Sequence, residues 1–568
     1  MSPSSHARTG GTAFDPASSR SAVPGRADAG LPDAMRPGAT APPASPGLRR
    51  LASHPVGVAA VAALILALLV EAAPVVGGDL MAQAWWATWA SSNRSPVDLG
   101  WFGGVPVVSY SLLGPWLGAL LGLPLAGILG TVLGAASTTA LLGRLHPFPT
   151  RWTAAGLVAA GTWAANQWSG RTTFGAGAAL GCLALVVVAL PRRWTARLGG
   201  TVLAALAGAT SPVASVFLLL AAAAWWCGGQ SDLPRLRVGP AGAWCLAGGA
   251  LLPLGAARLL GAVSGPQPAS NHQMVAALAA TGLTYAVVPA TQRILRIGVV
   301  GTAMLLLATW LIGDPVGSNS VRLVLLFAAP VVVAAARIRG TAIVLAALAV
   351  PWLVPPVVVM DLAPRDPGPA TLRAQALVGE LARRGPVGRI EVVPLHDHEE
   401  SLFVGSRVPL ARGWLRQLDT ARNALFYDGS LNAADYLQWL RGAGASYVAL
   451  PSGRPDWRSG SEAALLRHGV PGLQKVWSDA SWQLFQVSAG NVVHGNGVLL
   501  SSDRSRLVVD VPAPGRLEIA LWWSQWSSVR GPGGCVGPGP RAGWTTLTVH
   551  LPGRYVLSGA WRPTGRCR

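Results

Sequence analysis

The sequence predicts a polytopic α-helical membrane protein of about eleven transmembrane helices, followed by an extracytoplasmic α/β domain and a small β-rich module. Of the 568 residues, 51% are hydrophobic and 12% are charged, and the mean hydropathy is +0.42. Soluble domains carry about 25% charged residues. The deficit of charge is concentrated between Leu51 and Met360, and beyond Met360 short helical and alternating segments replace the long apolar runs.

Residues 1–50 are predicted to form a disordered cytoplasmic tail. They are rich in Ser, Ala, Gly and Pro and contain no apolar core. No apolar stretch begins near Met1, which argues against a signal peptide. The first apolar run follows Arg49 and Arg50, and we expect it to be an uncleaved helix whose N-terminus faces the cytoplasm.

The region 51–360 is predicted to be a multi-span membrane domain. Several runs are shorter than the usual ~20 residues, so some neighbouring spans could be fused or tilted helices. The segment 209–212 (Ala-Thr-Ser-Pro) breaks one long run, either as a tight outer turn or as a break that lines a substrate path. The predicted spans are 55–76, 120–143, 152–168, 172–190, 198–210, 212–227, 239–262, 274–290, 295–313, 321–336 and 340–359.

Arginine positions predict the topology. The basic residues are nearly all Arg, and many lie singly at the ends of apolar runs, as the positive-inside rule describes. This distribution also argues against nucleic acid as a partner, despite a formal charge of +20. An odd number of spans places everything after Met360 outside the plasma membrane. The predicted cytoplasmic loops hold Arg144, Arg151, Arg192, Arg193, Arg197, Arg235, Arg237, Arg293, Arg296, Arg337 and Arg339, and the outer side holds Arg94, Arg171, Arg258 and Arg322.

The outer region divides at about residue 489. Residues 361–489 mix helical and strand patterns and predict an α/β domain. Residues 490–568 contain short strands separated by Gly/Pro turns and predict a β-rich module. Cys535 and Cys567 lie in this module, and their pairing in a disulfide is an open alternative.

The first outer loop contains the strongest candidates for chemistry. Asp79 follows the first span directly, and a carboxylate at the mouth of a membrane helix usually faces water, a partner or a substrate. We take Asp79 and Asp98 as candidate catalytic acids, although Asp98 could be a turn residue. The segment from Trp85 to Tyr110 is predicted to be loop-like. Its aromatic side chains suit either sugar stacking or an interfacial belt, and the candidate substrate-binding residues are Gln83, Trp85, Trp101 and Tyr110.

Three further outer residues are candidates for substrate binding. Arg322 follows a polar loop that contains Asn319, and its guanidinium suits the phosphate of a lipid carrier. The alternative is an arginine that pairs with Asp314 at the membrane surface. His272 belongs to a second polar cluster. Glu71, near the outer end of the first span, is either functional or a hydrogen-bonded core acid.

The segment His396-Asp397-His398-Glu399-Glu400 has the composition of a metal site, but no further ligand accompanies it. A solvated loop is the favoured interpretation, so no metal ligands are assigned. The cofactor is unknown, and a divalent metal ion is one candidate. No P-loop, GxSxG or HExxH motif occurs.

Short motifs resemble those of actinobacterial polytopic membrane proteins with GT-C glycosyltransferase organisation. They are Gly78-Asp79-Leu80, 106–115, 317–323 and 411–419. The resemblance implies a catalytic Asp in the first outer loop, a polyprenyl-phosphate sugar donor and an outer soluble domain. The chain lacks the adjacent pair of acids that several members of that superfamily have.

The predicted function is therefore transfer of a sugar from a polyprenyl-phosphate donor, held at the membrane lipid, to a cell-envelope glycan acceptor on the outer face. The alternatives are a transporter or flippase for a lipid-linked or small solute, and a non-enzymatic envelope scaffold. A transporter predicts broken helices arranged in two repeats, and no convincing internal repeat is present.

Overall fold

The computed structural model describes residues 53–92, 95–145, 151–190, 193–228, 239–336, 340–366, 368–541 and 543–567. The predicted cytoplasmic tail at residues 1–50 lies outside them. So do Arg94, Arg192, Arg235, Arg237, Arg337 and Arg339, on which part of the predicted topology rests. Residues Arg50–Arg568 form one compact unit by their contacts, so the division into domains at residues 361 and 490 stays a prediction.

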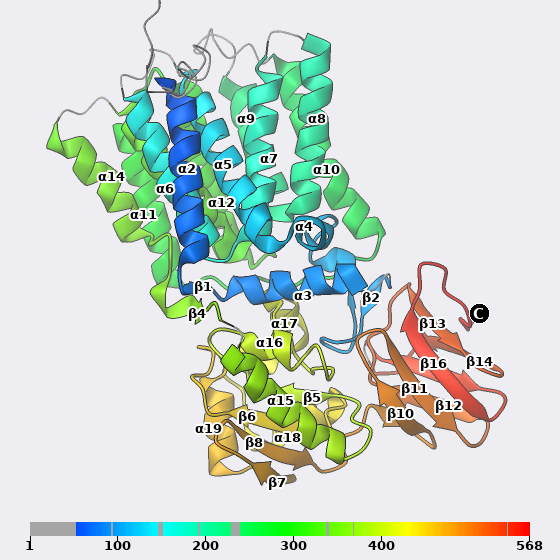
Figure 1. Cartoon of the computed structure of the whole chain (residues 1–568). Coiled ribbons are helices and arrows are strands. Elements are labelled where there is room, and N and C mark those ends of the chain that lie inside the picture. The colour runs from blue at the N-terminus through cyan, green and yellow to red at the C-terminus, as the bar shows by residue number, and fades with distance from the viewer. Residues whose placement is uncertain are drawn as a thin grey trace, which may run out of the picture. The chain divides into compact units, whose positions relative to one another are not determined.

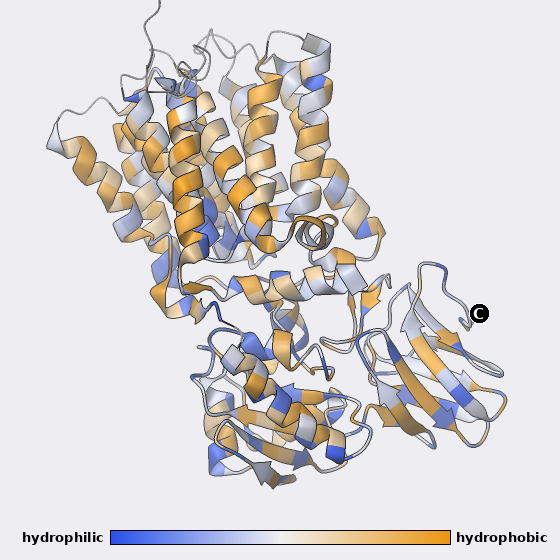
Figure 2. Cartoon of the chain, viewed as in Figure 1, coloured by the Kyte–Doolittle hydropathy of each residue, from blue (hydrophilic) through white to orange (hydrophobic). Residues whose placement is uncertain are grey.

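Among the described residues, a helix overlaps each of the eleven ranges predicted as spans, and these helices run side by side (Figure 1). Many residues along these helices are hydrophobic, as the orange segments of the ribbon show (Figure 2). Four of the helices, α2, α5, α10 and α12, and the helical stretch Gly317–Ala335 that ends in α13 are long and apolar enough to cross a membrane. The count of eleven spans stays a prediction. The helices are α2 (Pro55–Ala72), α5 (Leu123–Leu142), α6 (Trp152–Trp168), α7 (Thr172–Val188), α8 (Arg193–Thr210), α9 (Pro212–Gly228), α10 (Pro240–Leu259), α11 (Asn271–Val287), α12 (Arg293–Ile312), α13 (Arg322–Ala335) and α14 (Thr341–Leu353).

The segment predicted to be the first outer loop, residues 79–121, is called the first outer segment below. It begins with a helix, which corrects the prediction that its tryptophans lie in a loop. Helix α3 covers Asp79–Ser92, and the shorter elements β2 (Val97–Asp98), β3 (Val105–Pro106), η1 (Val107–Ser109) and α4 (Gly114–Leu121) follow it. Residues 80–84 (Leu-Met-Ala-Gln-Ala) are strong helix formers. Trp85, Trp86 and Trp89 then fall on one helix face and are fully buried.

These tryptophans belong to the core of the mixed helix and strand segment at residues 361–489, which we call the α/β part. They share one hydrophobic cluster with Trp101, Leu377, Ile390 and other residues of the α/β part. The α/β part contains a four-stranded sheet with the strand order β5-β6-β8-β7, in which β5 and β6 are parallel and the other neighbouring pairs are antiparallel. The elements are β4 (Leu362–Pro364), α15 (Gly368–Arg383), β5 (Ile390–Val392), α16 (Glu399–Phe403), α17 (Arg416–Arg422), α18 (Ala433–Gly442), β6 (Tyr447–Pro451), α19 (Gly460–His468), β7 (Leu473–Ser478) and β8 (Trp482–Val487), with the 3-10 turns η2 (Gly317–Val321), η3 (Val359–Asp361) and η4 (Ala424–Phe426).

The C-terminal residues form two four-stranded antiparallel sheets, β10-β11-β16-β13 and β14-β15-β12-β9. Val97 and Leu99 of the first outer segment lie in the hydrophobic cluster of these sheets. A disulfide joins Cys535 and Cys567, which decides the pairing that the sequence left open. The strands are β9 (Val493–His494), β10 (Val498–Ser502), β11 (Arg506–Val511), β12 (Gly515–Ile519), β13 (Ser527–Arg530), β14 (Gly534–Pro538), β15 (Thr545–Val549) and β16 (Gly553–Gly559).

A buried ion pair fastens the first outer segment to the C-terminal sheets. Asp98 is fully buried, and Arg504 Nη2 donates to its Oδ2 at 2.7 Å. The guanidinium of Arg504 also lies 3.4 Å from the centre of the Trp85 ring. Trp85 in turn stacks on Trp101 with 4.4 Å between ring centres. Arg504 thus links the Asp98 carboxylate to the stacked rings of Trp85 and Trp101, and these residues have a structural role.

We expect Arg504→Ala to destabilise the protein by about 3–5 kcal/mol, because it leaves the buried Asp98 carboxylate unpaired. Denaturant unfolding of the purified full-length protein, followed by tryptophan fluorescence, measures the loss. Arg506→Ala is the matched control, because its pair with Asp503 at 3.3 Å is exposed and is worth at most about 1 kcal/mol. Equal losses in the two variants would contradict a structural role for the Asp98 pair.

Candidate functional site

A large cavity, which we name the Asp79 cavity, has a volume of about 930 Å³. Residues from the helix ends of the membrane part and from the α/β part both line it. Five of the residues predicted for the site are among them, namely Asp79, Gln83, Tyr110, Asn319 and Arg322. The remaining four, Asp98, Trp85, Trp101 and His272, are not.

Asp79 faces two arginines without being saturated by them. Its Oδ2 lies 3.6 Å from Arg171 Nε and 3.7 Å from Arg322 Nη2, which are ion-pair distances longer than a hydrogen bond. The Asp79 side chain is 37% exposed, and those of Arg171 and Arg322 are 19% and 18% exposed. The Arg171 Nε is buried and has no hydrogen-bond partner among the described residues. The Asp79 carboxylate is therefore accessible to a ligand, whereas the Arg171 Nε is enclosed beside it.

Glycines explain how Asp79 comes so close to the turn between α6 and α7. A Cβ on Gly77 would collide with the carbonyl of Ser169, and a Cβ on Gly170, which has a φ of +71°, would collide with the carbonyl of Gly77. Gln83 holds the same turn from the other side. Its side-chain amide donates to the Gly170 carbonyl, and its Oε1 accepts from Thr173 N at 2.6 Å. Gln83 thus positions the turn that carries Arg171.

Arg322 opens helix α13 after the short turn η2. Asp314 does not pair with Arg322 but accepts from the backbone N–H groups of Val316 and Gly317 at 2.9 and 2.8 Å. It therefore shapes the loop that contains Asn319, which is 8% exposed. Arg322 lies over the ring of Phe174, 4.9 Å from its centre, so its orientation is set by packing as well as by charge.

Tyr110 lines the cavity beside Thr173, and burial raises the pKa of its phenol. The phenol therefore stays protonated and can donate a hydrogen bond. Tyr110 also stacks on Trp86, with 5.8 Å between ring centres. Ser270 and Gln273 line the cavity, whereas His272 between them is exposed and lies outside the lining. Of the predicted polar cluster of Asn271, His272 and Gln273, only Gln273 therefore lines the cavity.

Asp361 is a cavity residue that the sequence analysis did not single out. It follows the last apolar helix, and its backbone carbonyl accepts from Gly78 N at 2.8 Å. Its carboxyl lies close enough to Asp79 for the two charges to interact. Burial raises the pKa of the Asp361 carboxyl, and the charge of Asp79 raises it further. A second acid, absent next to Asp79 in sequence, is thus supplied from 282 residues further along the chain.

Two other predictions are settled by local contacts. Glu71 is a bonded structural acid, because it accepts from Arg365 Nη1 at 2.8 Å and from Gln167 Nε2 at 2.7 Å. The break between α8 and α9 is a tight turn, and its residues Thr210, Ser211 and Pro212 also line the cavity. The turn and the lining role, which the sequence offered as alternatives, both occur.

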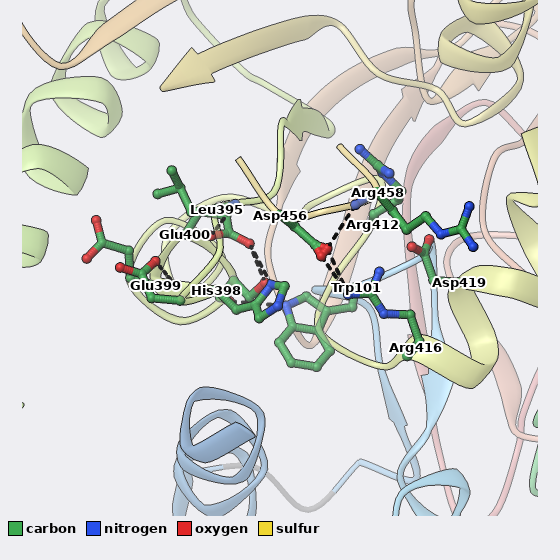
Figure 3. Close-up of polar contacts among 12 residues, drawn as sticks. Trp101, Leu395, His398, Glu399, Glu400, Arg412, Arg416, Asp419, Asp456 and Arg458 are labelled. Carbon is green, nitrogen blue, oxygen red and sulfur yellow. Dashed lines mark hydrogen bonds and ion pairs between the residues drawn. The ribbon is translucent and has the colours of Figure 1, made fainter. Parts of the chain in front are cut away.

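The histidine-rich segment 396–400 is not a solvated loop, which corrects the favoured interpretation. His398 is buried and stacks on Trp414, with 3.5 Å between ring centres. The Glu400 carboxylate lies 3.8 Å from His398 and accepts from the backbone N–H of Leu395 at 3.2 Å (Figure 3). No group of three or more His, Cys, Asp or Glu in the described part of the chain is placed to hold a metal ion. The side chains described there do not fit a metal centre held by the protein alone.

The α/β part contributes the opposite wall of the Asp79 cavity. We name Arg416, Arg454, Asp456, Trp457 and Arg458 the domain-side wall, and all five line the cavity. Arg416 Nη2 donates to both oxygens of Asp456 at 2.8 and 2.9 Å, and Arg458 lies beside the same carboxylate (Figure 3). Sequence analysis missed this wall because Arg416 begins helix α17, whereas the other four residues lie in a loop more than 35 residues further along the chain.

Comparisons with known proteins give little direct guidance. No family model matches the chain, and no curated protein matches it. The Archaeoglobus fulgidus oligosaccharyltransferase in complex with Zn and sulfate is similar over 70% of this chain and 68% of that one, at 11% identity and a TM-score of 0.36. The archaeal oligosaccharyltransferase AglB from A. fulgidus, in complex with an inhibitory peptide and a dolichol-phosphate, covers 70% and 69%, at 10% identity and a TM-score of 0.37. TM-scores this low establish neither a shared fold nor a shared function.

The raised pKa of Asp361 predicts a pH-dependent gain in stability for Asp361→Asn. The folded pKa lies above that of the unfolded chain, so ionisation of Asp361 lowers stability as the pH rises through the folded pKa. Asparagine removes that cost. We expect a higher melting temperature than wild type at pH 7.5, and a difference that disappears below about pH 4, where both states are protonated.

Asp510→Asn, at an exposed position on β11, is the control and should change the melting temperature little at either pH. In an Asp79→Asn background the gain from Asp361→Asn should shrink, because one of the charges that opposes ionisation is gone. A gain that is independent of pH would contradict this electrostatic origin.

Proposed function

We propose that this protein is a membrane glycosyltransferase that moves a sugar from a polyprenyl-phosphate donor to a cell-envelope glycan on the outer face of the plasma membrane. The observation that carries the proposal is the exposed Asp79 carboxylate between Arg171 and Arg322, at a cavity lined by both membrane helices and the α/β part. A scaffold would need no such site. A scaffold reading also expects Asp79 to be buried against a structural partner, and it is 37% exposed.

In the proposed reaction, Asp79 accepts the proton of the acceptor hydroxyl as its oxygen attacks the anomeric carbon of the donor sugar. The bond between that carbon and the phosphate oxygen breaks, and the electron pair leaves with the polyprenyl phosphate. General-base assistance of this kind contributes about 10²–10⁴-fold in rate. Because Asp79 is not saturated by hydrogen bonds from its arginine neighbours, it has lone pairs to offer the incoming hydroxyl.

Arg171 and Arg322 are the proposed contacts to the phosphate. The charge on the leaving phosphate grows during bond cleavage, and a fixed guanidinium stabilises developing charge of this kind. Arg322 lies in the helical stretch Gly317–Ala335, which is long and apolar enough to cross a membrane, and this suits a donor whose lipid stays in the bilayer. Asn319 and Tyr110 add polar groups for the donor sugar, and Gln83 keeps the Arg171 turn in place.

We expect Asp79→Asn to lower sugar transfer by about 10²–10⁴-fold, since asparagine cannot accept the proton. The measurement is transfer from a radiolabelled polyprenyl-phosphate sugar to envelope glycan in membranes that contain the full-length protein. Asp510→Asn at the surface should retain wild-type activity. Full activity of Asp79→Asn, at equal protein level, would rule out the catalytic role.

Arg322→Gln should weaken the apparent affinity for the lipid donor, with the loss mainly in KM for the donor rather than in KM for the acceptor. A hydrogen bond to a charged group contributes about 1.5–3 kcal/mol, which is roughly 10- to 150-fold in affinity. Arg322→Lys should recover part of it, because the charge remains but the bidentate geometry is lost. Arg516→Gln, at an exposed position on β12, is the control. An unchanged donor KM in Arg322→Gln would remove Arg322 from the phosphate site.

A further inference from the structure

The domain-side wall presents a large aromatic ring to the cavity. Trp457 is 66% exposed although it lines the Asp79 cavity. The guanidinium of Arg458 lies 4.3 Å from the centre of this ring, and that of Arg416 lies 5.7 Å from it. Among the described residues, five other tryptophans are fully buried, namely Trp85, Trp86, Trp89, Trp101 and Trp163. Trp457 is therefore an apolar surface left open at a polar cavity.

The loop that carries Trp457 is held on both sides of the ring. Before it, Arg454 O accepts from His396 N at 3.1 Å, and Leu395 pairs with Pro455 in an isolated β-bridge. Next to it, Asp456 is 2% exposed, its backbone N–H donates to Pro394 O at 2.8 Å, and its carboxylate receives the two bonds from Arg416. The exposed ring thus stands on a rigid base, which lowers the entropy cost of binding a ligand against it.

Positive charge is in excess on this wall and balanced on the other. Around Asp79, the two arginines Arg171 and Arg322 face the two carboxylates of Asp79 and Asp361. On the domain-side wall three arginines face only Asp456, which Arg416 already neutralises. Within the described residues, Arg454 and Arg458 form no ion pair. Arg454 Nη1 donates to Met360 Sδ at 3.8 Å, and Arg458 Nη1 donates only a long bond of 3.5 Å to the backbone carbonyl of Tyr427.

We propose that the domain-side wall is the acceptor subsite and that it selects an anionic glycan, a sugar that carries a carboxylate or a phosphate. The apolar face of a pyranose ring would pack on Trp457, and its anionic group would lie between Arg454 and Arg458. The inference rests on the proposed function, because it names the acceptor for the transfer at Asp79.

The chemistry of the wall favours a sugar over an acidic peptide. The face of an indole ring is electron-rich and attracts the polarised C–H groups on the flat side of a pyranose. The two arginines supply fork-shaped donors that match a carboxylate or a phosphate. A peptide strand would bind through backbone hydrogen bonds to a sheet edge, and no described strand edge is among the lining residues of this wall.

Binding without any donor tests the inference. Purified full-length protein in detergent is titrated by calorimetry with a neutral disaccharide, the same disaccharide ending in a uronic acid, the same disaccharide phosphate, and an acidic hexapeptide. We expect both anionic sugars, or one of them, to bind at least about tenfold more tightly than the neutral sugar, a difference equal to about one charge-assisted hydrogen bond. The better of the two identifies the anion.

Variants separate the ring from the charges. Trp457→Ala should weaken binding of the anionic sugar by about tenfold, and Trp457→Phe should restore most of it, because stacking needs only an aromatic face. The double variant Arg454→Gln/Arg458→Gln should reduce the preference for the anionic sugar over the neutral one to less than about twofold. Trp561→Ala, which removes a tryptophan that is 47% exposed and outside the cavity lining, should bind as wild type.

Three outcomes would overturn the inference: equal binding of neutral and anionic sugars, binding that Trp457→Ala leaves unchanged, or tighter binding of the acidic peptide than of any sugar. These outcomes are distinct from failure of the proposed function. If the binding preference holds but no Asp79-dependent transfer occurs, the glycosyltransferase proposal fails alone. If Asp79-dependent transfer occurs but the preference is absent, the acceptor subsite fails alone.

Discussion

A short antiparallel ladder joins the end of the first membrane helix to the start of the α/β part, and the site depends on it. Val75, Val76 and Gly77 of β1 (Val75–Gly77) pair with Pro364, Ala363 and Leu362 of β4. The ladder continues in the bond from Gly78 N to the carbonyl of Asp361. Arg365, just beyond β4, then donates to Glu71 at the C-terminal end of α2.

This arrangement explains why Asp79 and Asp361 lie at one cavity although the whole membrane part separates them in the chain. Each acid lies fewer than ten residues past an apolar helix, since α2 ends at Ala72 and α14 ends at Leu353, and the ladder brings the two helix ends together. It also explains the demand for small residues at the crossing, since the Gly77 backbone has no room for a Cβ beside Ser169. A change that separates β1 from β4 would move the Asp361 carboxyl away from Asp79, and so would alter the charges around Asp79 without replacing Asp79 itself.

The two acids of the first outer segment show how environment decides the role of a residue type. Asp98 is completely buried, and its charge is balanced by one arginine and by the backbone N–H of Gly100 at 2.9 Å. Such a pair holds two parts of the chain together and leaves no lone pair facing a ligand. Asp79 has two arginines at longer distance and more than a third of its side chain exposed. Only Asp79 combines charge with access.

Sequence alone predicted the helices of the membrane part, the mixed α/β segment and the β-rich character of the C-terminal part, because each depends on a local period of apolar residues. It also singled out Asp79 and Arg322, since charges at helix mouths stand out against apolar runs. It failed for Trp85 and Trp101. Their aromatic character is equally compatible with sugar stacking, a membrane belt and a protein core, and only the packing of α3 against the α/β part distinguishes these.

Asp361 and the domain-side wall needed information that a local pattern does not contain. Asp361 has the same sequence signal as Asp79, a lone acid after an apolar run. Its proximity to Asp79 depends on the pairing of β1 with β4, which no local pattern predicts. Arg171 likewise stood out as an arginine on the side predicted to hold few, which is a usable signal for a functional cation. Arg416 begins helix α17 and Asp456 lies in a loop further along the chain, and no local sequence pattern predicts that the two side chains pair.

The charge pattern of the two walls has a consequence for how the proposed reaction would be organised. Balanced charge around Asp79 lets the carboxylate and its arginines act on a donor phosphate without a strong net field, and the arginines are the groups that respond as the leaving phosphate gains charge. The excess positive charge lies on the domain-side wall, where it would attract an anionic acceptor before any bond is broken. Because the two walls come from different parts of the chain, donor and acceptor recognition could change independently while Asp79 stays between them.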